Sequence, residues 1–503
     1  MALSAILGNE ERLAAAVAGR DARFDGWVFL AVTSTRIYCR PSCPAVKPKR
    51  EHMRFYASAA AAQEAGFRAC KRCRPDAAPG SPAWDWRSDV AARAMRLIGE
   101  GVVDREGATG LAARLGYSLR QLERLLIAEV GAGPAALARA QRAQCARVLI
   151  ESTSLEMGRV AFAAGFASIR AFNRTVAEVY ACSPTELRQR AAARGDGSSD
   201  AGGVIGLRLA YREPFEASNL FGHLAAAAAP GVEEWRAGAY RRTLRLPHGP
   251  GVASLRPGPG YVECRLRLAD VRDVSAAVAR CRRALDLDAD PVAAAEVLEA
   301  DPLLGPSAKH TPGRRVPRKA DSAEYALRAV IGQQVSTAAA ATIAARLAEQ
   351  YGEAVADPDG GLGRLFPSPE RMAEVDPADL PMPGRRKRTV LSLAAALADG
   401  RVDVGPGADW ASARAALALL PGVGPWTIEM IAMRALGDPD AFPVGDLGLV
   451  RGAERLGLPA SPKALAASAE AWRPWRAYAT QYLWATSDHP TNKVPTGQEE
   501  TAR

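Results

Sequence analysis

The clustering of cysteines constrains the fold of this chain more than any other feature of its sequence. Of the eight cysteines, Cys39 and Cys43 are separated by three residues. Cys70 and Cys73 are separated by two. Two short loops with this spacing can converge on one tetrahedral ion, and in a reducing compartment such a cluster is more often a metal centre than a disulfide framework. The sequence therefore predicts a small zinc domain, with a purely structural zinc knuckle as the most common alternative.

Length and composition indicate several mainly helical domains. At 503 residues, the chain is longer than one hydrophobic core usually organises. Hydrophobic residues make up 48% and aromatic residues 6%, spread through alanine-rich periodic stretches that favour soluble helical domains. The net charge of +10 suits a polyanionic partner, although charge alone is weak evidence. The first residues lack a basic start followed by an apolar core, so we expect a cytoplasmic location.

Stretches rich in Gly and Pro at 75–83, 193–203 and 305–321 indicate domain boundaries. The last stretch is basic, and the sequence does not decide between a solvated linker and a loop that contacts DNA. We predict domains at 1–80, 86–193, 204–317 and 318–490, followed by a disordered tail at 491–503.

The periodicity of hydrophobic residues assigns a fold class to each part. The pattern is helical throughout 88–193, whereas 204–270 contains alternating runs such as VIGLRLAY, RRTLRLP and YVECRLRL, which are typical of strands. Helices return from Ser322, where Asp321 and Glu324 stand at the spacing of a capping box. The expected order is a small metal domain, a helical domain, a mixed α+β domain and a second helical domain.

The metal domain resembles a known family of methyl acceptors. The run FDGWVFLAVTSTRIYCRPSCP, followed by RFYASAAAAQEAGFRACKRCRPD, resembles the N-terminal domain of the Ada methyl acceptors over residues 10–76. The resemblance implies that Cys39 is the nucleophile that takes a methyl group from a DNA methylphosphotriester, and that Cys43, Cys70 and Cys73 complete the zinc site. Val46 stands where the family often has a basic residue.

Zinc chemistry is consistent with that role, because zinc holds sulfur as the thiolate, and only the thiolate is a competent nucleophile. Four thiolates on one Zn²⁺ carry two net negative charges, and methylation of Cys39 would remove one of them. We therefore expect the affinity for DNA phosphate to rise after methylation.

Two segments have the pattern of a helix-turn-helix. LAARLGYSLRQLERLL places Gly116 at a turn and Ser118 at a helix N-cap, and MGRVAFAAGFASIRAFNRTV repeats the arrangement with Gly165 and Ser168. An ordinary helical pair is the alternative for one such turn. Two copies, with the continuation VYACSPTELR, resemble the AraC-type DNA-binding domain over about 88–192.

The resemblance places polar side chains on the outer faces of the recognition helices. Arg170, Asn173 and Arg174 would lie on the second recognition helix, with side chains suited to base edges and phosphates. Arg120 and Arg124 are their counterparts in the first unit, and a solvated helix face is the alternative for each arginine.

The C-terminal half contains a candidate hairpin in the string LPGVGPWTIEM at 420–430. A Gly-x-Gly turn that opens a helix presents free backbone N–H groups to a phosphate, although the motif alone more often marks an ordinary turn. Together with FPVGDLGL at 442–449 and RAVIGQQVS at 328–336, it resembles the AlkA-type 3-methyladenine DNA glycosylases of the helix-hairpin-helix superfamily, over 205–488.

This second resemblance assigns roles to individual residues. It makes Asp446 the catalytic carboxylate, where a plain helix cap is the alternative. It places Gly422, Gly424 and Thr427 at the DNA, and Gln334 at the wedge position that fills the gap left by a flipped nucleotide.

Two tryptophans match positions of the base pocket, with core packing as the alternative for each. Trp426 and Trp484 could stack on an electron-poor alkylated base. Trp426 also occupies the position of the Schiff-base lysine of bifunctional relatives, so we expect no lyase step. Met430 and Leu447 replace aromatic residues seen in some relatives.

The sequence thus predicts a monofunctional DNA glycosylase for alkylated purines such as 3-methyladenine, fused to a methylphosphotriester-accepting transcriptional regulator of the alkylation response. The alternative is mainly a methylation-sensing regulator whose C-terminal half only binds DNA. Repair at guanine O6 is disfavoured because no Pro-Cys-His string occurs. We expect Zn²⁺ as cofactor, double-stranded DNA (alkylated and promoter) as partner, no membrane, and a monomer.

Overall fold

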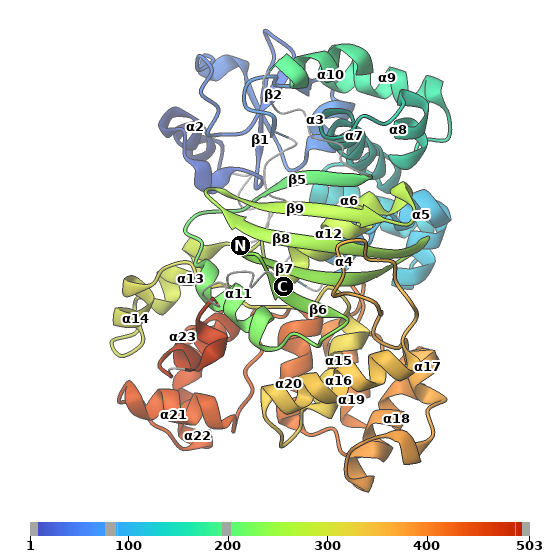
Figure 1. Cartoon of the computed structure of the whole chain (residues 1–503). Helices are drawn as coiled ribbons and strands as arrows, with labels where there is room; N and C mark the ends of the chain where they lie inside the picture. The colour runs from blue at the N-terminus through green and yellow to red at the C-terminus, as the bar shows by residue number, and fades with distance from the viewer. Residues whose placement is uncertain (1–8, 76–86, 88, 194–202, 488, 495–503) are drawn as a thin grey trace. The chain divides into compact units, whose positions relative to one another are not determined.

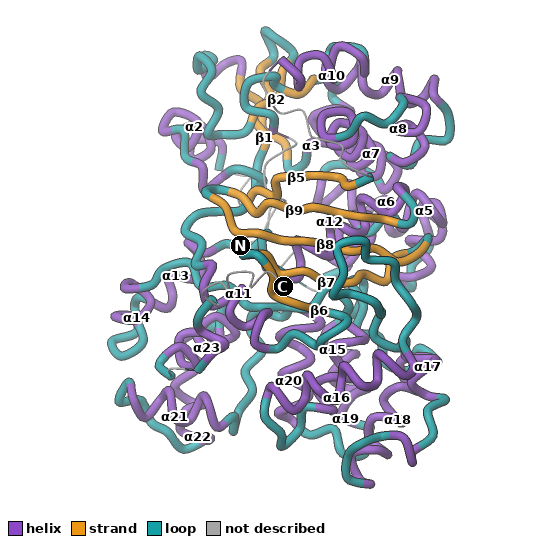
Figure 2. The backbone as a smooth tube through the Cα atoms, viewed as in Figure 1, coloured by secondary structure: helices purple, strands orange, loops and turns teal. Residues whose placement is uncertain are grey.

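The computed structural model describes residues 9–75, 87, 89–193, 203–487 and 489–494. The chain divides into two compact units, which are described separately below. Unit 1 comprises 1–211 and 264–279, and unit 2 comprises 212–263 and 280–503. None of the helices in the described ranges is both long and apolar enough to cross a membrane. The elements are labelled in Figure 1, and Figure 2 separates helices from strands.

The cysteine-rich part of unit 1 is built on a small sheet with the strand order β3-β1-β2-β4. Its elements are α2 (Glu10–Gly19), β1 (Phe29–Val32), β2 (Ile37–Cys39), β3 (Met53–Tyr56), α3 (Ala59–Glu64) and β4 (Arg68–Ala69). Strand β1 pairs antiparallel with β2 and β3, whereas β2 and β4 are parallel. Leu13 and Val17 of α2 are buried, because α2 turns its apolar face inward.

Seven helices follow in unit 1, as the periodicity predicts. They are α4 (Val90–Gly99), α5 (Val102–Leu115), α6 (Leu119–Val130), α7 (Pro134–Ser152), α8 (Met157–Ala163), α9 (Ile169–Tyr180) and α10 (Pro184–Ala193). Ser118 caps α6 in a capping box with Gln121, and Ser168 caps α9. Gly116 and Gly165 have φ values of +79° and +84°, which glycine adopts without strain. The predicted turns and caps are therefore confirmed.

Helix α3 of the cysteine-rich part packs into the core of these helices. Ala60 and Ala61 belong to one buried cluster with residues of α4 to α7. The Ser58 hydroxyl donates to the carbonyl of Val130, at 2.9 Å. The two parts of unit 1 thus share a core.

A five-stranded sheet follows, with the strand order β5-β9-β8-β7-β6. Its strands are β5 (Val204–Ala210), β6 (Glu233–Arg236), β7 (Ala239–Leu246), β8 (Gly249–Gly258) and β9 (Tyr261–Leu268), with helix α11 (Ala217–Ala226) between β5 and β6. Burial alternates along β5 and β9, as predicted, but β7 is buried along most of its length. The buried residues of β7 include Arg241 and Arg242. The polar residues that alternate with apolar ones in this strand are therefore buried as well, rather than exposed.

Unit 2 is otherwise helical. After α12 (Val274–Ala284), which begins in unit 1, its helices are α13 (Pro291–Leu298), α14 (Gly305–His310), α15 (Ser322–Ile331), α16 (Thr337–Tyr351), α17 (Pro369–Ala373), α18 (Gly384–Ala398), α19 (Trp410–Ala418), α20 (Pro425–Ile431), α21 (Leu447–Arg455), α22 (Pro462–Ser468) and α23 (Arg476–Ala485). Asp321 caps α15 as predicted. The Glu324 carboxylate does not complete a capping box and instead binds Arg242 and Arg328.

The basic stretch at 305–321 is not a solvated linker throughout, because its second half is buried. Its first residues form α14, and the side chains of Arg315, Arg318 and Lys319 are at most 4% exposed. Arg318 pairs with Asp286 at 2.9 Å, and Lys319 pairs with Glu233 at 2.7 Å. Internal carboxylates thus compensate Arg318 and Lys319, whereas Arg315 donates to the backbone carbonyls of Arg212 and Pro214.

The predicted tail at 491–503 lies mostly outside the described residues. The short 3-10 helix Pro490–Asn492 is the last helical turn described. The backbone of Lys493 lies against Gly222 of α11, where a Cβ atom would be 2.5 Å from the Lys493 carbonyl oxygen.

Candidate functional site

The strand register brings the two cysteine pairs together. Tyr38 of β2 is the parallel partner of Ala69 of β4, so Cys39, the last residue of β2, lies beside Cys70, which follows β4. The Cys70 N–H donates to the Tyr38 carbonyl at 3.0 Å. Each strand end then turns, and the turns return Cys43 and Cys73 to the same place.

The four sulfur atoms have the geometry that a tetrahedral metal needs. All lie within 4.8 Å of one another, and the Sγ atoms of Cys43 and Cys70 are 4.0 Å apart. Zinc–sulfur bonds of about 2.3 Å in a tetrahedron require sulfur–sulfur distances of about 3.8 Å. The four side chains are buried, and the donor set is all thiol. The residues therefore fit Zn²⁺ with modest contraction.

Asp25 holds the loop between Cys39 and Cys43, a role that the sequence analysis missed. Its Oδ1 accepts from the Ser42 N–H at 3.0 Å, and its Oδ2 accepts from the Ser42 hydroxyl. Arg40 adds an ion pair at 3.6 Å, and Asp25 is 7% exposed. No pattern near Asp25 indicates this contact, because the partner lies in another element.

The recognition helices present the predicted side chains to solvent. On α9, Arg170, Asn173 and Arg174 are exposed, whereas Phe172 and Val176 are buried on the opposite face. Arg120 and Arg124 are likewise exposed on α6. These side chains are available to a ligand, although exposure alone also fits a solvated face.

Asp446 is held by three N–H donors. It is the N-cap of α21, and its Oδ1 accepts from the Leu449 N–H at 3.0 Å. The indole Nε1 of Trp484 donates to the same oxygen at 2.9 Å, and that of Trp426 donates to Oδ2 at 3.0 Å. Asp446 is thus a helix cap and also the hydrogen-bond acceptor of both tryptophans that were predicted to line the base pocket.

Two glycines on one face of α21 allow α23 to approach closely. A Cβ atom on Gly448 would lie 2.8 Å from Cδ1 of Trp484, and one on Gly452 would lie 2.3 Å from the Leu483 carbonyl oxygen. The spacing of four residues in DLGLVRG is a signal that could have indicated this packing. These glycines set the position from which Trp484 reaches Asp446.

The hairpin between α19 and α20 opens a helix with free N–H groups. Gly422 has a φ of +87°, and Gly424 is an N-cap without a side-chain cap. The first-turn N–H groups of α20 therefore remain available to an anion. The Thr427 side chain is 2% exposed and accepts a hydrogen bond from Gln333 Nε2 at 2.9 Å, so a DNA contact there is left to its backbone.

Gln333 links the predicted wedge to this hairpin. Besides Thr427, its Nε2 also donates to the Gly422 carbonyl, at 3.2 Å. The adjacent Gln334 is exposed and has a φ of +56°, in the left-handed region. The sequence analysis singled out Gln334 and missed Gln333, whose role depends on the packing of α15 against α20.

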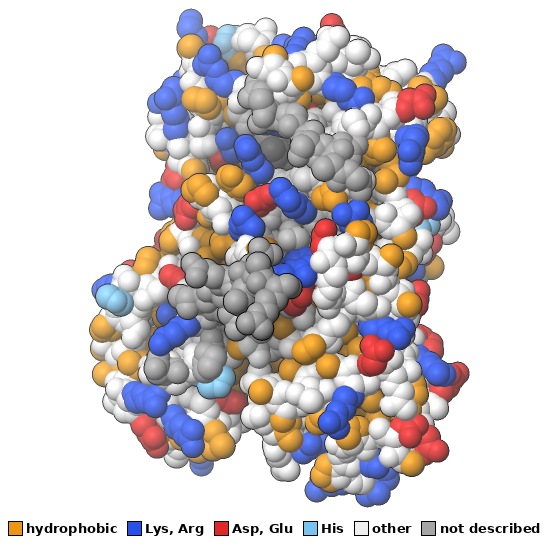
Figure 3. Space-filling view, in the orientation of Figure 1, with side chains coloured by type: hydrophobic (Ala, Val, Ile, Leu, Met, Phe, Trp, Pro, Cys, Tyr) orange, Lys and Arg blue, Asp and Glu red, His pale blue; other side chains and the backbone are white. Residues whose placement is uncertain are grey.

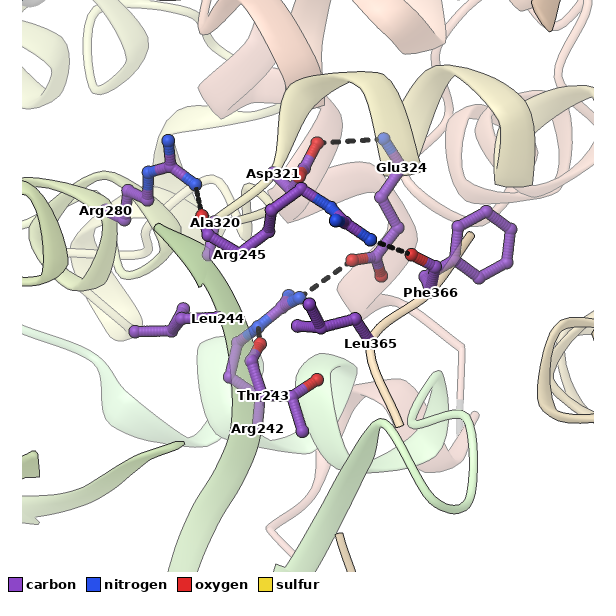
Figure 4. A pocket seen from close by; sticks show the side chains of 10 residues that line it. All are labelled: Arg242, Thr243, Leu244, Arg245, Arg280, Ala320, Asp321, Glu324, Leu365 and Phe366. Carbon is purple, nitrogen blue, oxygen red and sulfur yellow. Dashed lines mark hydrogen bonds and ion pairs between the residues drawn. The ribbon is translucent and has the colours of Figure 1, made fainter. Parts of the chain in front are cut away.

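A small pocket in unit 2 is separate from this site. It has a volume of about 10 Å³, which is room for about one water molecule. Figure 4 shows its lining residues, Arg242, Thr243, Leu244, Arg245, Arg280, Ala320, Asp321, Glu324, Leu365 and Phe366. The three arginines already bind internal oxygen atoms, so the pocket offers no unengaged cation to a ligand.

Family models match the chain in four consecutive segments. They are the metal binding domain of Ada at 12–76, a helix-turn-helix domain at 111–190, the AlkA N-terminal domain at 206–321 and the HhH-GPD superfamily of base excision DNA repair proteins at 327–477. These matches define the class: a zinc-binding helix-turn-helix protein fused to a helix-hairpin-helix base excision repair protein. Zn²⁺ is accordingly the metal of the cysteine centre.

One relative extends over nearly the whole chain. The probable bifunctional transcriptional activator/DNA repair enzyme AlkA of Mycobacterium tuberculosis is 59% identical over 485 residues, which are 96% of this chain and 98% of the relative. The chain belongs to this family of fused transcriptional activator/DNA repair proteins.

Two further relatives match one part each. DNA-3-methyladenine glycosylase 2 of Escherichia coli is 31% identical over 55% of this chain and 96% of its own length. The bifunctional transcriptional activator/DNA repair enzyme Ada of the same organism is 42% identical over 25% of this chain and 35% of its own length.

Proposed function

We propose that the chain is a monofunctional DNA glycosylase that excises alkylated purines such as 3-methyladenine, with Asp446 as its catalytic carboxylate. The main observation that supports this proposal is that Asp446 accepts hydrogen bonds from indole N–H groups of two separate elements, α20 and α23. A relative that matches this half along 96% of its own length is named a DNA-3-methyladenine glycosylase, which supports the same substrate class.

The geometry supports a dissociative hydrolysis. The bond between the sugar C1′ and the cationic base breaks, and the base leaves with the bonding electron pair as a neutral molecule. Asp446 faces the positive charge that develops on the sugar, and the fixed indole donors keep the carboxylate in place while this happens. Water then adds to C1′ and loses a proton, for which the same carboxylate is the acceptor.

The hairpin and wedge are the proposed DNA contacts. Backbone N–H groups of Gly422, Gly424, Trp426 and Thr427 bind a phosphate, and Gln334 fills the space that the flipped nucleotide leaves. Trp426 and Trp484 form the base pocket. Because Trp426 occupies the position of a lysine in bifunctional relatives, no imine forms, and the sugar–phosphate backbone stays intact.

Base release from methylated duplex DNA tests this function. The intact protein should release free 3-methyladenine without nicking the strand, and Asp446→Asn should lower the rate constant about 100-fold or more. Asp399→Asn, at an exposed aspartate paired with Arg401, is the matched control and should keep the wild-type rate. Equal release by wild type and Asp446→Asn, or none by the wild type, would overturn the proposal.

We also propose that Cys39 accepts a methyl group from a DNA methylphosphotriester. The buried cluster of four sulfurs and the match to the metal binding domain of Ada support this activity. When bound, Zn²⁺ keeps the four sulfurs ionised at neutral pH. The Cys39 sulfur attacks the methyl carbon, the carbon–oxygen bond breaks, and the phosphodiester leaves as an anion. The centre loses one negative charge, so affinity for DNA rises.

Peptide mass mapping tests the acceptor. After incubation with methylphosphotriester DNA, the wild type should carry one added methyl group on Cys39, and Cys39→Ser should carry none. Cys145→Ser, at a buried cysteine of the same unit, is the control and should still accept the group. A methyl group on Cys43, Cys70 or Cys73 would contradict the choice of Cys39.

The remaining proposals concern organisation and partners. We propose domain limits of 1–80, 86–193, 204–317 and 318–490, and a monomer that binds alkylated and promoter DNA in the cytoplasm. The exposed faces of α6 and α9 support the promoter contact. Light scattering of the free protein and of its complex with a short duplex tests the monomer.

A further inference from the structure

Arg434 is a buried cation that is hydrogen-bonded to neutral groups. It lies in the π-helical turn η7 (Ala432–Leu436) that continues α20, and it is 3% exposed. Its Nη1 donates to Nε2 of His223 at 2.7 Å and to the Pro317 carbonyl at 2.9 Å, while its Nε has no hydrogen-bond partner. Within the described residues, no carboxylate forms an ion pair with it. Buried arginines are normally paired with a carboxylate, whereas Arg434 and Arg315 donate to neutral acceptors.

The neighbouring histidine does not compensate the charge. Burial, and next the charge of Arg434, hold the pKa of His223 well below its ordinary value, so the imidazole is neutral. Because Arg434 donates to Nε2, the imidazole proton is on Nδ1. The guanidinium therefore has only neutral acceptors in contact.

Trp484 connects this cation to the proposed site. The Arg434 guanidinium carbon is 5.3 Å from the centroid of the Trp484 ring, and the same ring donates its N–H to Asp446. The ring packs against Gly448 of α21, where an added Cβ atom would lie 2.8 Å from Trp484 Cδ1. The half-buried indole thus has a cation over its face and a carboxylate at its edge.

This arrangement balances the charge next to the base pocket. With both groups present, the Trp484 ring contacts one cation, Arg434, and one carboxylate, Asp446. A cation over an aromatic ring is attracted by the ring quadrupole, and its own charge opposes a second cation stacked on that ring. A neutral base is not repelled by the charge of Arg434. Without Arg434, Asp446 would be uncompensated and would attract a cationic base.

We propose that Arg434 is a specificity-determining residue that shifts the preference of the base pocket from cationic purines toward neutral ones. The inference rests on the proposed glycosylase function. The preference can be tested with hypoxanthine as the neutral base and 7-methylguanine as the cationic base. Arg434 acts through Trp484 and is not a catalytic residue.

The test compares two duplexes that differ only in the damaged base. Single-turnover rate constants for release of 7-methylguanine and hypoxanthine are measured with the full chain. Arg434→Met removes the charge and preserves an unbranched apolar stem. Arg434→Gln also removes the charge but keeps an N–H donor for Pro317, in case the first variant does not fold. Arg434→Lys keeps the charge and is the matched control.

The ratio of cationic to neutral base release should rise about tenfold in Arg434→Met and Arg434→Gln, and should return close to wild type in Arg434→Lys. A ratio that stays constant while both rates fall would show a purely structural role and overturn the inference. An equal rise in Arg434→Lys would do the same. If the wild type released neither base, the proposed function itself would fail, which distinguishes the two outcomes.

Discussion

The carboxylate of Asp446 both caps a helix and accepts hydrogen bonds from two indoles. The position of this carboxylate therefore depends on a few donor atoms. One carboxylate oxygen caps α21 and accepts from Trp484, and the other accepts from Trp426. Because α21 starts at this residue, any movement of the helix moves the carboxylate. The tryptophan contact in turn depends on a missing Cβ atom at Gly448.

We expect Gly448→Ala to impair base release more than DNA binding. The new methyl group would lie 2.8 Å from Trp484 Cδ1 and 3.0 Å from Asp446 Oδ1, so the indole must move away from the carboxylate. A displacement of this size costs about 10- to 100-fold in the chemical step. Gly363→Ala is the matched control, since a Cβ atom there meets nothing within 4 Å. Equal single-turnover rates in the two variants would contradict the argument.

At the scale of elements, the zinc centre is a product of strand pairing and of the loop that Asp25 holds. The parallel register of β2 and β4 places Cys39 beside Cys70, and the loop contacts of Asp25 direct Cys43 back toward them. Groups that orient metal ligands influence affinity although they do not touch the metal.

We expect Asp25→Ala to weaken zinc binding about 10- to 100-fold, because the loop would lose its acceptor for Ser42. Transfer of zinc to a chromogenic chelator measures this change. Asp21→Ala is the matched control, since Asp21 pairs locally with Arg23. Zinc transfer at the same rate from both variants would show that the cysteines alone position the loop.

At the scale of the whole molecule, buried charge joins the sheet to the helices of unit 2. Glu233 of β6 is 1% exposed and contacts Arg242, Lys319 and Arg328 from three other segments. Lys and Arg side chains are otherwise dispersed over the face seen in Figure 3, without one dominant patch. The excess of basic residues is therefore partly structural, since several of them are internal.

We expect Glu233→Gln to destabilise unit 2 by about 3–5 kcal/mol at pH 7, because three cations would lose their shared partner. Burial alone would raise the pKa of Glu233, but Arg328, Lys319 and Arg242 outweigh it and hold the pKa well below its ordinary value. This carboxylate therefore stabilises the fold above about pH 4.5 and loses that contribution as the pH falls further.

Hydrogen exchange of the α15 amides at pH 7 and in acid measures this contribution. Wild-type protection should fall more steeply with acid than that of Glu233→Gln. Glu353→Gln, at an exposed carboxylate paired with Arg245, is the control and should behave as the wild type. Similar acid profiles in all three proteins would indicate that Glu233 is not the group responsible.

The sequence alone predicted the elements and the cysteine cluster. Local signals were sufficient for the turns at Gly116 and Gly165, the caps at Ser118 and Ser168, and the four cysteine ligands, since these depend on residues close together in the chain. The resemblance to AlkA-type glycosylases, rather than spacing, indicated Asp446 and both tryptophans. Whether they form a catalytic site was not determined by spacing.

Only the tertiary structure decided which side chains meet. Three features depend on segments that are far apart in sequence. They are the contact of Arg434 with Trp484, the hydrogen bonds of Asp25 to Ser42, and the burial of cations in the basic stretch at 305–321. A charged residue has the same local pattern whether it is solvated or paired inside the fold. The difference depends on a compensating partner that only packing brings into range, which is why charge was the weakest predictor here and periodicity the strongest.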